Sequence, residues 1–442
     1  MKLIGPCTAD KIGKEEAEVD YDELVLPMIK ARPSLFVPHY ESASDRAKAI
    51  DEAVEKYYSR RWFHIMGSRV LSRSFDVPKG SVDPDDSGDD DDDDDAMEIS
   101  AEQEDEEAGT VNSISMVPMA DMLNALPQAH NARLEFLEDK LEMRATADIQ
   151  QGEQLFNTYA NPPNHDLLRR YGYVDLSEPD PEREADSVDV GINNLVELDW
   201  SHLIDAILAL KGVKKDSPNY QESFDQLQNR IDQYTELDLI PEDGVEIGHI
   251  PRKLADEAKW PSASAHHEAA FAFLQDPQGH GHEHGQETSP LEDLWPVCRL
   301  LWVEEEKYQE NLAKEKSFSA GQHSVLRDAS RTEADSVVAV KVLKAAILAR
   351  MERYSLHEHD IACDTREWHQ VDEVAYKQLL SDQAAASAAA RRAKAAYVVR
   401  IGEKQLLSRL HKVCECSLAL YESKLRENAA RSTTQASNKR KR

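Results

Sequence analysis

The side chains best suited to chemistry lie within residues 116–173, where Tyr159 and Tyr171 stand among short apolar segments. A phenol hydroxyl can donate and accept a hydrogen bond, and its ring provides an apolar wall. By spacing alone, this stretch predicts a hairpin with aromatic residues and names no reaction. Elsewhere the spacing gives no Ser/His/Asp set, no phosphate-binding Walker loop and no glycine-rich dinucleotide turn.

Histidines gather in residues 261–290, a second place where chemistry could be sought. They are His266, His267, His280, His282 and His284. A metal site needs a scaffold that fixes its geometry, and the sequence GHGHEHG offers none, so we interpret this segment as a low-complexity loop that interrupts a helical pattern. The five cysteines are scattered and predict reduced thiols. We therefore expect no metal site.

Alternating apolar and polar residues predict the elements that position the tyrosines. Residues 134–136 and 141–145 alternate on either side of a polar turn, which indicates a hairpin. A short strand is expected over residues 154–159 and a helix over residues 166–171. Short strands beside helices favour an α+β fold.

Helical spacing dominates on both sides of this stretch. One helix should start at Tyr21 and end at Pro33, and another should run over residues 44–70 and deliver Arg73. Beyond about residue 195 the pattern is helical almost throughout, with apolar faces such as that of Leu203, Ile204, Ile207, Leu208 and Leu210.

The 442-residue chain carries a formal net charge of -32, and about half of that excess lies in residues 76–107. This balance argues against direct nucleic-acid binding, which needs clustered Lys and Arg, and suits a basic protein partner. The aspartate run of residues 89–95 predicts a disordered segment, either a solvated loop without a role or an electrostatic lure. No run of apolar residues predicts a membrane span, so we expect a soluble intracellular protein.

The last four residues, 439–442, form the basic cluster KRKR after a polar run. We interpret it as a nuclear import signal, with a merely solubilising terminus as the alternative. The protein is thus expected in the nucleus, and also in the cytoplasm before import.

Four motifs together resemble a known family. In order, they are MVPMADMLNA, HNARLEF, GEQLFNTYA and LLRRYGY, all within residues 116–173. They resemble the C-terminal half of a SET domain in the group that contains the Rubisco large-subunit methyltransferase, the SET-domain-containing protein 6 type and, most closely, the fungal ribosomal lysine N-methyltransferases of type 4. Residues 21–36 and 72–75 resemble the helical insertion of that group.

The resemblance implies a partial SET domain, with short antiparallel strands and a helical insertion, followed by an all-α substrate-binding domain. The expected layout is a helical insertion over residues 1–76, an acidic insertion over 77–110, the C-terminal part of the SET domain over 111–175, the helical domain over 195–430 and a basic tail over 431–442.

The implied function is methyl transfer from S-adenosyl-L-methionine to a protein lysine, on a basic ribosomal or chromatin protein and most specifically a 60S ribosomal protein. We expect the enzyme to be a monomer and to have no membrane among its partners. Two alternatives stay open. The chain could be a non-catalytic SET-derived module that binds a basic partner, or an acidic chaperone for basic proteins.

The resemblance also assigns residues. Tyr159 would be the catalytic tyrosine, and Tyr171 would close the lysine channel and contact the cofactor. Asn124 would hold the amino-acid end of the cofactor, and Ala125, where the family usually has histidine, would contact it through its backbone. Arg73 would contact the cofactor or the channel. For both tyrosines, ordinary core packing is the alternative.

Two features depart from the family. Ala160 stands where a glycine usually follows the catalytic tyrosine. The family also begins with a strand and a Gly-x-Gly turn around the cofactor, and no such element precedes Tyr21. We therefore expect the N-terminal part of the SET domain to be missing here, either from an incomplete sequence or from a genuinely shortened product.

Overall fold

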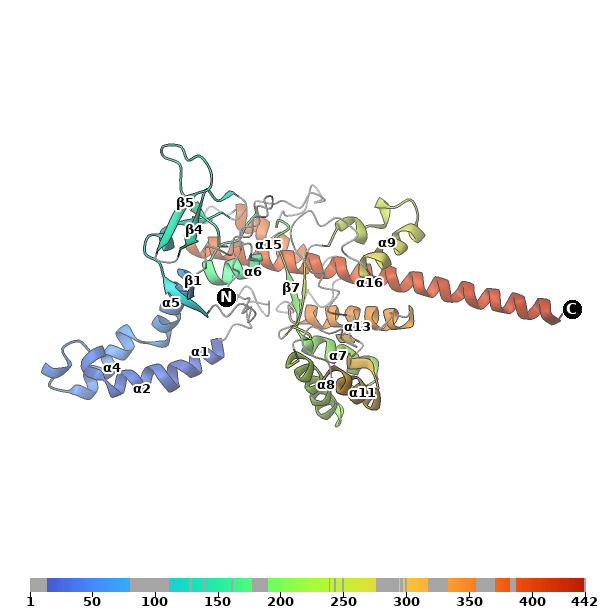
Figure 1. The fold of residues 1–442 in the computed structure, drawn as a ribbon, viewed down its shortest axis with the longest axis horizontal. Coiled ribbons are helices and arrows are strands. Elements are labelled where there is room, and N and C mark those ends of the chain that lie inside the picture. The colour runs from blue at the N-terminus through green and yellow to red at the C-terminus, as the bar shows by residue number, and fades with distance from the viewer. Residues whose placement is uncertain are drawn as a thin grey trace. The chain divides into compact units, whose positions relative to one another are not determined.

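The structure, a computed structural model, describes residues 14–79, 111–176, 190–275, 294–316, 333–354, 370–381 and 387–440, with short gaps inside the second, third and fourth ranges. Contacts divide the chain into two compact units. We call residues 9–177 the strand unit and residues 178–442 the helical unit. Figure 1 labels their elements.

The strand unit opens with a series of short helices. They are α1 (Lys14–Asp20), the π-helix η2 (Tyr21–Val25), α2 (Leu26–Ala31), α3 (Pro33–Phe36), the 3-10 helix η3 (Tyr40–Ser42), α4 (Arg46–Tyr57) and α5 (Arg60–Leu71). The first predicted helix ends at Ala31 as expected from Pro33, but helical winding already begins at Lys14 rather than at Tyr21. Pro33 then begins a helix of its own. Proline is well suited to that position because its missing N–H has no partner in a first turn.

The single helix predicted over residues 44–70 is wrong, because α4 ends at Tyr57 and α5 begins at Arg60. Asp45 caps α4 by accepting a hydrogen bond from the Lys48 amide at 3.1 Å. The Tyr58 hydroxyl donates to the Phe36 carbonyl at 2.8 Å, and the Tyr21 hydroxyl donates to the Tyr58 carbonyl at the same distance. These long-range bonds fix the corner between the two helices.

Short strand pairs follow. β1 (Ser74–Lys79) pairs antiparallel with β2 (Val111–Met116), and β4 (Ala132–Phe136) pairs antiparallel with β5 (Leu141–Ala145), which confirms the predicted hairpin. The expectation of antiparallel strands is wrong for one pair, because β3 (Asn124–Ala125) pairs in parallel with β6 (Phe156–Asn157). Of the strand predicted over residues 154–159, only the two residues of β6 are a strand. The remaining elements are η5 (Ala120–Met122), α6 (Asn164–Asp166) and the π-helix η7 (Leu167–Tyr171).

The helical unit contains the longer helices. They are α7 (Trp200–Leu210), α8 (Tyr220–Thr235), α9 (Ala263–Gln275), α11 (Glu305–Glu315), α13 (Glu333–Glu352), α15 (Gln370–Ser381) and α16 (Ala388–Arg440), with 3-10 turns η8 (Arg252–Ala255) and η9 (Glu257–Lys259). The prediction that this unit is purely helical is wrong, because β7 (Val196–Leu198) pairs antiparallel with β8 (Val245–Ile247). The fold remains helix-rich with few strands, which is compatible with the predicted α+β class.

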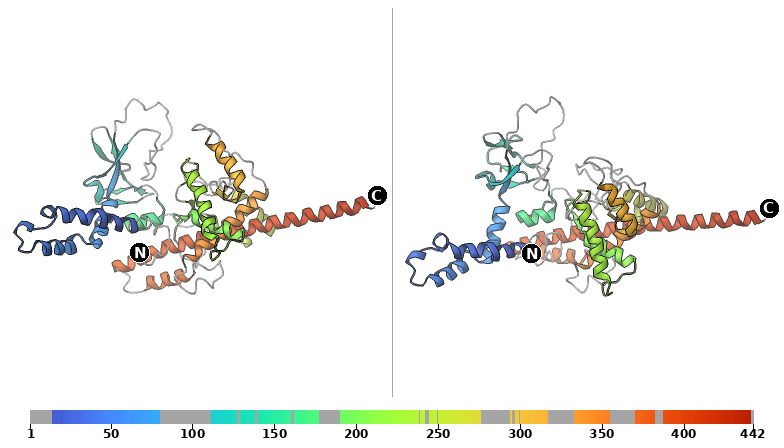
Figure 2. Two further views of the ribbon diagram at one scale, coloured as in Figure 1. Left: turned by 90° about the horizontal axis from the view of Figure 1, so that it is seen from below. Right: turned by 60° about the horizontal axis from the view of Figure 1, so that its bottom comes forward.

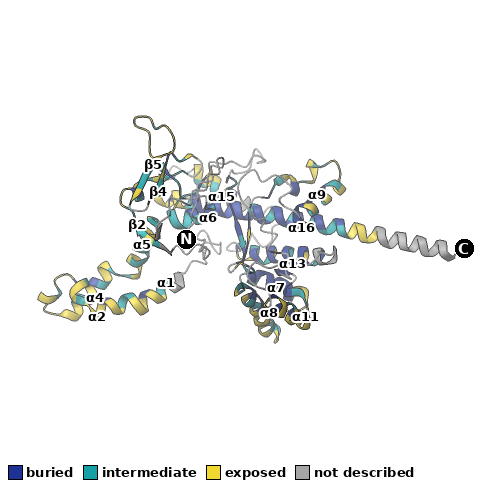
Figure 3. Cartoon of the chain, in the orientation of Figure 1, coloured by how far each residue is buried: buried dark blue, intermediate teal, exposed yellow. Residues whose placement is uncertain are grey.

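Most of the buried apolar side chains lie in the helical unit. On α7, Leu203, Ile204, Ile207 and Leu208 are buried as predicted, whereas Leu210 is exposed. The long helix α16 contacts α9, α13 and α15, and its middle part is buried (Figures 2 and 3). Burial of this many apolar side chains is the main stabilising term available to the fold.

Part of the histidine-rich segment differs from its interpretation. Residues 263–275 form the helix α9, so His266 and His267 lie on a regular scaffold rather than in a loop. The other three histidines, the acidic run over residues 89–95 and Ala160 lie outside the described residues. Among the helices of the described ranges, none is both long enough and apolar enough to cross a membrane.

Candidate functional site

Tyr159 follows β6 by two residues and is fixed by one hydrogen bond. Its hydroxyl donates to the carbonyl of Leu123 at 2.8 Å. Leu123 directly precedes β3, the strand that pairs in parallel with β6, so the bond joins two segments that the chain separates by 36 residues. The phenol proton is engaged in this bond, which leaves the lone pairs of the oxygen to accept.

Tyr171 lies against Tyr159. The two rings are stacked, with centroids 4.4 Å apart and an interplanar angle of 26°. Tyr171 ends the π-helix η7, and Gly172 closes this helix with φ of 81°, a left-handed conformation that glycine adopts without strain. The structure thus brings together the two tyrosines that the sequence singled out.

Arg73 follows the end of α5 by two residues and lies near Tyr159. Its guanidinium donates to the Asp121 carbonyl at 2.6 Å and lies 3.6 Å from the Asp121 carboxylate. Both charges act on the Tyr159 hydroxyl, where Arg73 lowers its pKa and Asp121 raises it. The predicted residue Arg73 is therefore close to Tyr159, with Asp121 as a partner that the sequence did not indicate.

Asn124 and Ala125 form β3, which pairs with β6, the strand that leads to Tyr159. Asn124 is opposite Phe156 and Ala125 is opposite Asn157 in the parallel register. The Asn124 side chain is exposed and Ala125 is half-buried. An exposed amide carries both a donor and an acceptor, so its chemistry fits the ammonium and carboxylate of an amino acid. Contact of either residue with a cofactor stays a prediction.

Asn131 is a supporting residue that the sequence reasoning missed. Its buried side chain donates to the Gln154 carbonyl at 3.0 Å and accepts from the Phe156 amide at 2.8 Å. Its own amide donates to the Phe156 carbonyl at 3.1 Å. These bonds hold the short strand that leads to Tyr159. The available signal was an asparagine inside the motif HNARLEF, in front of a strand.

Burial governs the titration of the phenols. It raises the pKa of Tyr159, and a second contribution in the same direction comes from Tyr171. Burial likewise raises the pKa of Tyr171 and of Tyr173, well above the ordinary value of 10.0 for Tyr173. All three phenols therefore stay protonated at neutral pH. They can donate or accept hydrogen bonds and can place ring faces against a cation, but none supplies a phenolate base.

Tyr173 is the second residue that the sequence reasoning missed. Its ring centroid lies 6.4 Å from that of Tyr171, and its hydroxyl is buried with no hydrogen-bond partner among the described residues. Nearby, the buried Asn164 side chain donates to the Asp175 carbonyl at 3.1 Å and accepts from the Asp175 amide at 2.7 Å, which fixes the segment that contains Tyr173. The second tyrosine of LLRRYGY was the available signal.

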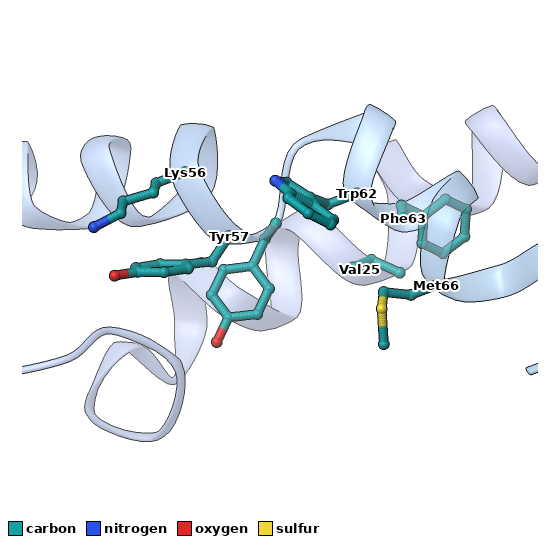
Figure 4. A pocket seen from close by; sticks show the side chains of 7 residues that line it. Val25, Lys56, Tyr57, Trp62, Phe63 and Met66 are labelled. Carbon is teal, nitrogen blue, oxygen red and sulfur yellow. The ribbon is translucent and has the colours of Figure 1, made fainter. Parts of the chain in front are cut away.

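A separate hollow lies on the helices that open the strand unit, with a volume of about 670 Å³. Its lining is mostly apolar and includes Val25, Tyr57, Trp62, Phe63 and Met66 (Figure 4). None of the predicted site residues lines it. It is a concave surface of the helices that open the strand unit rather than part of the tyrosine cluster.

Comparison with known proteins gives the chain its relatives. No protein-family model matches it. N-lysine methyltransferase SETD6 of Homo sapiens is 26% identical over 304 residues, which cover 68% of this chain and 52% of that protein. N-lysine methyltransferase SETD6 of Mus musculus is 41% identical over 171 residues, covering 39% and 27%. Ribosomal lysine N-methyltransferase 4 of Saccharomyces cerevisiae is 36% identical over 143 residues, covering 30% and 24%.

The matched part of the chain spans about half the length of the human relative and less of the other two. The aligned proteins are all named as lysine methyltransferases, in agreement with the motifs around Tyr159. The chain is thus a relative of the SETD6-like SET-domain lysine methyltransferases.

Proposed function

We propose that this chain is an S-adenosyl-L-methionine-dependent protein-lysine N-methyltransferase and that its substrate is a basic protein of the 60S ribosomal subunit. The observation that carries the proposal is the arrangement of Tyr159, whose ring is stacked on Tyr171 and whose hydroxyl is bound to the Leu123 carbonyl. The names of the human and yeast relatives support the reaction class, and the yeast name supports the ribosomal substrate.

The cofactor's chemistry fits the donors present. S-adenosylmethionine, when bound, supplies a methyl group on a sulfonium sulfur, which leaves as a neutral thioether. Asn124 is exposed and would hold the amino-acid end, and Ala125 would contribute its backbone. The faces of Tyr159 and Tyr171 suit a cation such as a sulfonium. Arg73, held by Asp121, would complete this side of the site.

The role of Tyr159 follows from its hydrogen bond. A lysine amine attacks carbon only when it is deprotonated, and desolvation beside half-buried rings lowers the pKa of a lysine. Because the Tyr159 hydroxyl donates its hydrogen bond to the Leu123 carbonyl, its oxygen can accept an N–H of the incoming amine. That bond orients the nitrogen lone pair toward the methyl carbon. The bound cofactor would supply the methyl carbon that this lone pair attacks, and the contribution of Tyr159 would be to align the two.

A radiolabel assay tests this proposal. The purified chain is incubated with S-adenosylmethionine labelled on the methyl carbon and with a 60S ribosomal protein extract. We expect label on lysine, and a drop of about 100-fold in rate for Tyr159→Phe, at the lower end for removal of a positioned polar group. Tyr57→Phe is the control, because Tyr57 is an exposed tyrosine of the same unit.

The assay has clear contrary outcomes. Equal transfer by Tyr159→Phe and by the unmodified chain would remove Tyr159 from the reaction. Absence of transfer, together with retained binding of ribosomal proteins, would favour a non-catalytic binding module. An N-terminally extended version then separates a non-catalytic module from an enzyme that needs more sequence. Transfer by the extended version alone would mean that the reaction needs sequence outside this chain.

We also propose that the acidic balance of -32 selects a basic substrate and that residues 439–442 direct nuclear import. A fluorescent fusion of the whole chain should accumulate in the nucleus, and replacement of these four residues by alanine should spread it through the cell. An unchanged distribution would leave the tail without this role.

Methyl transfer to the basic substrate should also fall with added salt, because screening weakens attraction between separated surface charges.

A further inference from the structure

Two adjacent histidines of α9 and one cysteine of α16 form a cluster that the proposed reaction does not use. One ligand atom from each of His266, His267 and Cys416 can be chosen so that all three lie within 4.8 Å of one another. His266 is fully buried, Cys416 is 4% exposed and His267 is half-buried. We propose that these three side chains bind Zn²⁺ and that the ion clamps α9 onto α16.

The position of His266 follows from the start of α9. The Ser262 hydroxyl accepts a hydrogen bond from the Ala265 amide at 3.2 Å and so caps the first turn. His266 then faces inward together with Ala270, Phe273 and Leu274, which are all buried and lie at helical spacing from it. Helix α9 packs against α16, so the inward face of α9 is brought to the helix that carries Cys416.

A hydrogen bond sets the tautomer of His266. Its Nε2 lies 2.8 Å from the carbonyl oxygen of Leu254, which can only accept, so Nε2 carries the proton. In the neutral ring, Nδ1 then has a free lone pair, and a histidine that donates its other N–H to a carbonyl is the usual arrangement for a metal ligand. The Trp260 ring is stacked on His266 with centroids 5.9 Å apart and limits the positions that the imidazole can take.

The distances are near those of a bound site. The Cys416 sulfur lies 3.8 Å from His266 Nδ1. Zinc bonds of about 2.3 Å to sulfur and about 2.0 Å to nitrogen at a tetrahedral angle place the two ligand atoms about 3.5 Å apart. The same sulfur lies 3.9 Å from Nε2, so the Cys416 side chain must rotate toward Nδ1 when the ion enters. The widest pair is at most 4.8 Å apart and must approach by up to roughly 1.5 Å, which side-chain rotation can supply.

The donor types select the metal. Two imidazoles and a thiolate suit Zn²⁺, and hard ions such as Mg²⁺ and Ca²⁺ prefer oxygen. The thiolate is the form of cysteine that binds a metal, so zinc binding would release the thiol proton to solvent as the sulfur–metal bond forms. With three protein ligands, water takes the fourth position of a tetrahedral ion.

The clamp would join segments that are far apart in the sequence. Cys416 and His266 are separated by 150 residues, so the ion would close a long loop within the helical unit. A cross-link of that kind restricts the unfolded chain more strongly than a short one. The expected effect of zinc is therefore on the stability of the helical unit and not on methyl transfer.

Cobalt substitution tests the site. The whole chain is kept reduced with a phosphine and titrated with Co²⁺, whose thiolate complex gives a charge-transfer absorption band. We expect one equivalent of bound Co²⁺ with this band, displaced by Zn²⁺. Cys416→Ser should abolish the band, whereas Cys414→Ser should keep it, because Cys414 is an equally buried cysteine outside the cluster.

Two further variants keep the proposal falsifiable if Cys416→Ser does not fold. His267 is only half-buried, so His267→Gln should fold and should weaken Co²⁺ binding at least about 10-fold, the lower end even for residues that only support a ligand. The triple variant His280→Gln, His282→Gln, His284→Gln should keep the band. A chain without the band, a band that persists in Cys416→Ser, or an unchanged Co²⁺ affinity in His267→Gln would overturn the site.

Discussion

The two units of this protein differ in how their side chains are held in place. In the helical unit, apolar side chains such as Ile204 and Leu407 are fully buried, and the unit also contains a buried ionic network. In the strand unit, most of the large exposed apolar residues are found, among them Leu24 and Met66, and the tyrosine cluster is held by hydrogen bonds to the backbone. Figure 3 shows the contrast between the buried α7 and α13 and the exposed α4. A site can thus be positioned by a few directional bonds while its neighbour supplies most of the apolar burial.

The largest test of this contrast concerns the ionic network. Arg350 lies 3.5 Å from the Glu403 carboxylate, donates to the Glu197 carbonyl at 3.3 Å and packs over the Tyr354 ring. Arg350→Leu should lower the free energy of unfolding by about 3–5 kcal/mol, because a buried charge loses its partner. Urea denaturation followed by circular dichroism measures the change. Arg426→Leu is the control, since its ion pair is exposed. Similar small effects in both variants would contradict the contrast.

Apolar burial comes next in size. Ile204→Ala removes methylene groups from a fully buried position and should cost about 2–5 kcal/mol. Met66→Ala removes a side chain that is 50% exposed in the strand unit and should cost less than about 1 kcal/mol. The same urea experiment compares the two. An equal loss for Met66→Ala would mean that the exposed face of α5 is covered in solution.

Within the strand unit, the directional bonds should matter more than burial. Asn131→Ala deletes two side-chain bonds to the Gln154–Phe156 backbone and should cost about 1–3 kcal/mol locally, because a buried amide loses its acceptor. Amide hydrogen exchange at Phe156 should accelerate. Asn124→Ala should leave that exchange unchanged, because its side chain is exposed. Unchanged exchange in Asn131→Ala would show that β6 is held by other contacts.

The smallest effect is a pH dependence. Burial, the largest cause, raises the pKa of Glu403 above its ordinary value of 4.5, against the opposing charge of Arg350. As pH rises from about 4.5 to the folded-state pKa, the unfolded state has already released this proton and the folded state has not, so stability falls in that window. Glu403→Gln should flatten this part of the stability profile. A profile with the same slope in both proteins would show that Glu403 does not titrate there.

The sequence predicted the elements whose patterns are local. The hairpin of β4 and β5 follows from strict alternation, and the apolar face of α7 follows from helical spacing. The break at Tyr58 and Ser59 was missed because it depends on hydrogen bonds to Phe36 and from Tyr21, which are distant in the chain. The spacing of residues within a short segment does not indicate contacts of this kind.

The same limit applies to the site. The tyrosines and Arg73 were found through family motifs, whereas Asp121, Asn131 and Tyr173 were not, because their roles depend on pairings that only the folded chain brings about. The histidines of α9 were placed in a loop because their composition resembles low complexity. Their helix depends on its contact with α16, some 150 residues away.

The π-helix η7 sets the rotational phase of Tyr171. The Gly172 amide bonds to the Leu167 carbonyl at 3.0 Å, five residues back, so this turn holds one residue more than an α-helical turn closed four residues back. Each residue of an α-helix advances the side-chain direction by about 100°. Regular α-helical winding of the same residues would advance each side chain differently and turn the Tyr171 ring away from Tyr159. The aromatic pair is therefore encoded by the length of this turn as much as by the identity of its tyrosines.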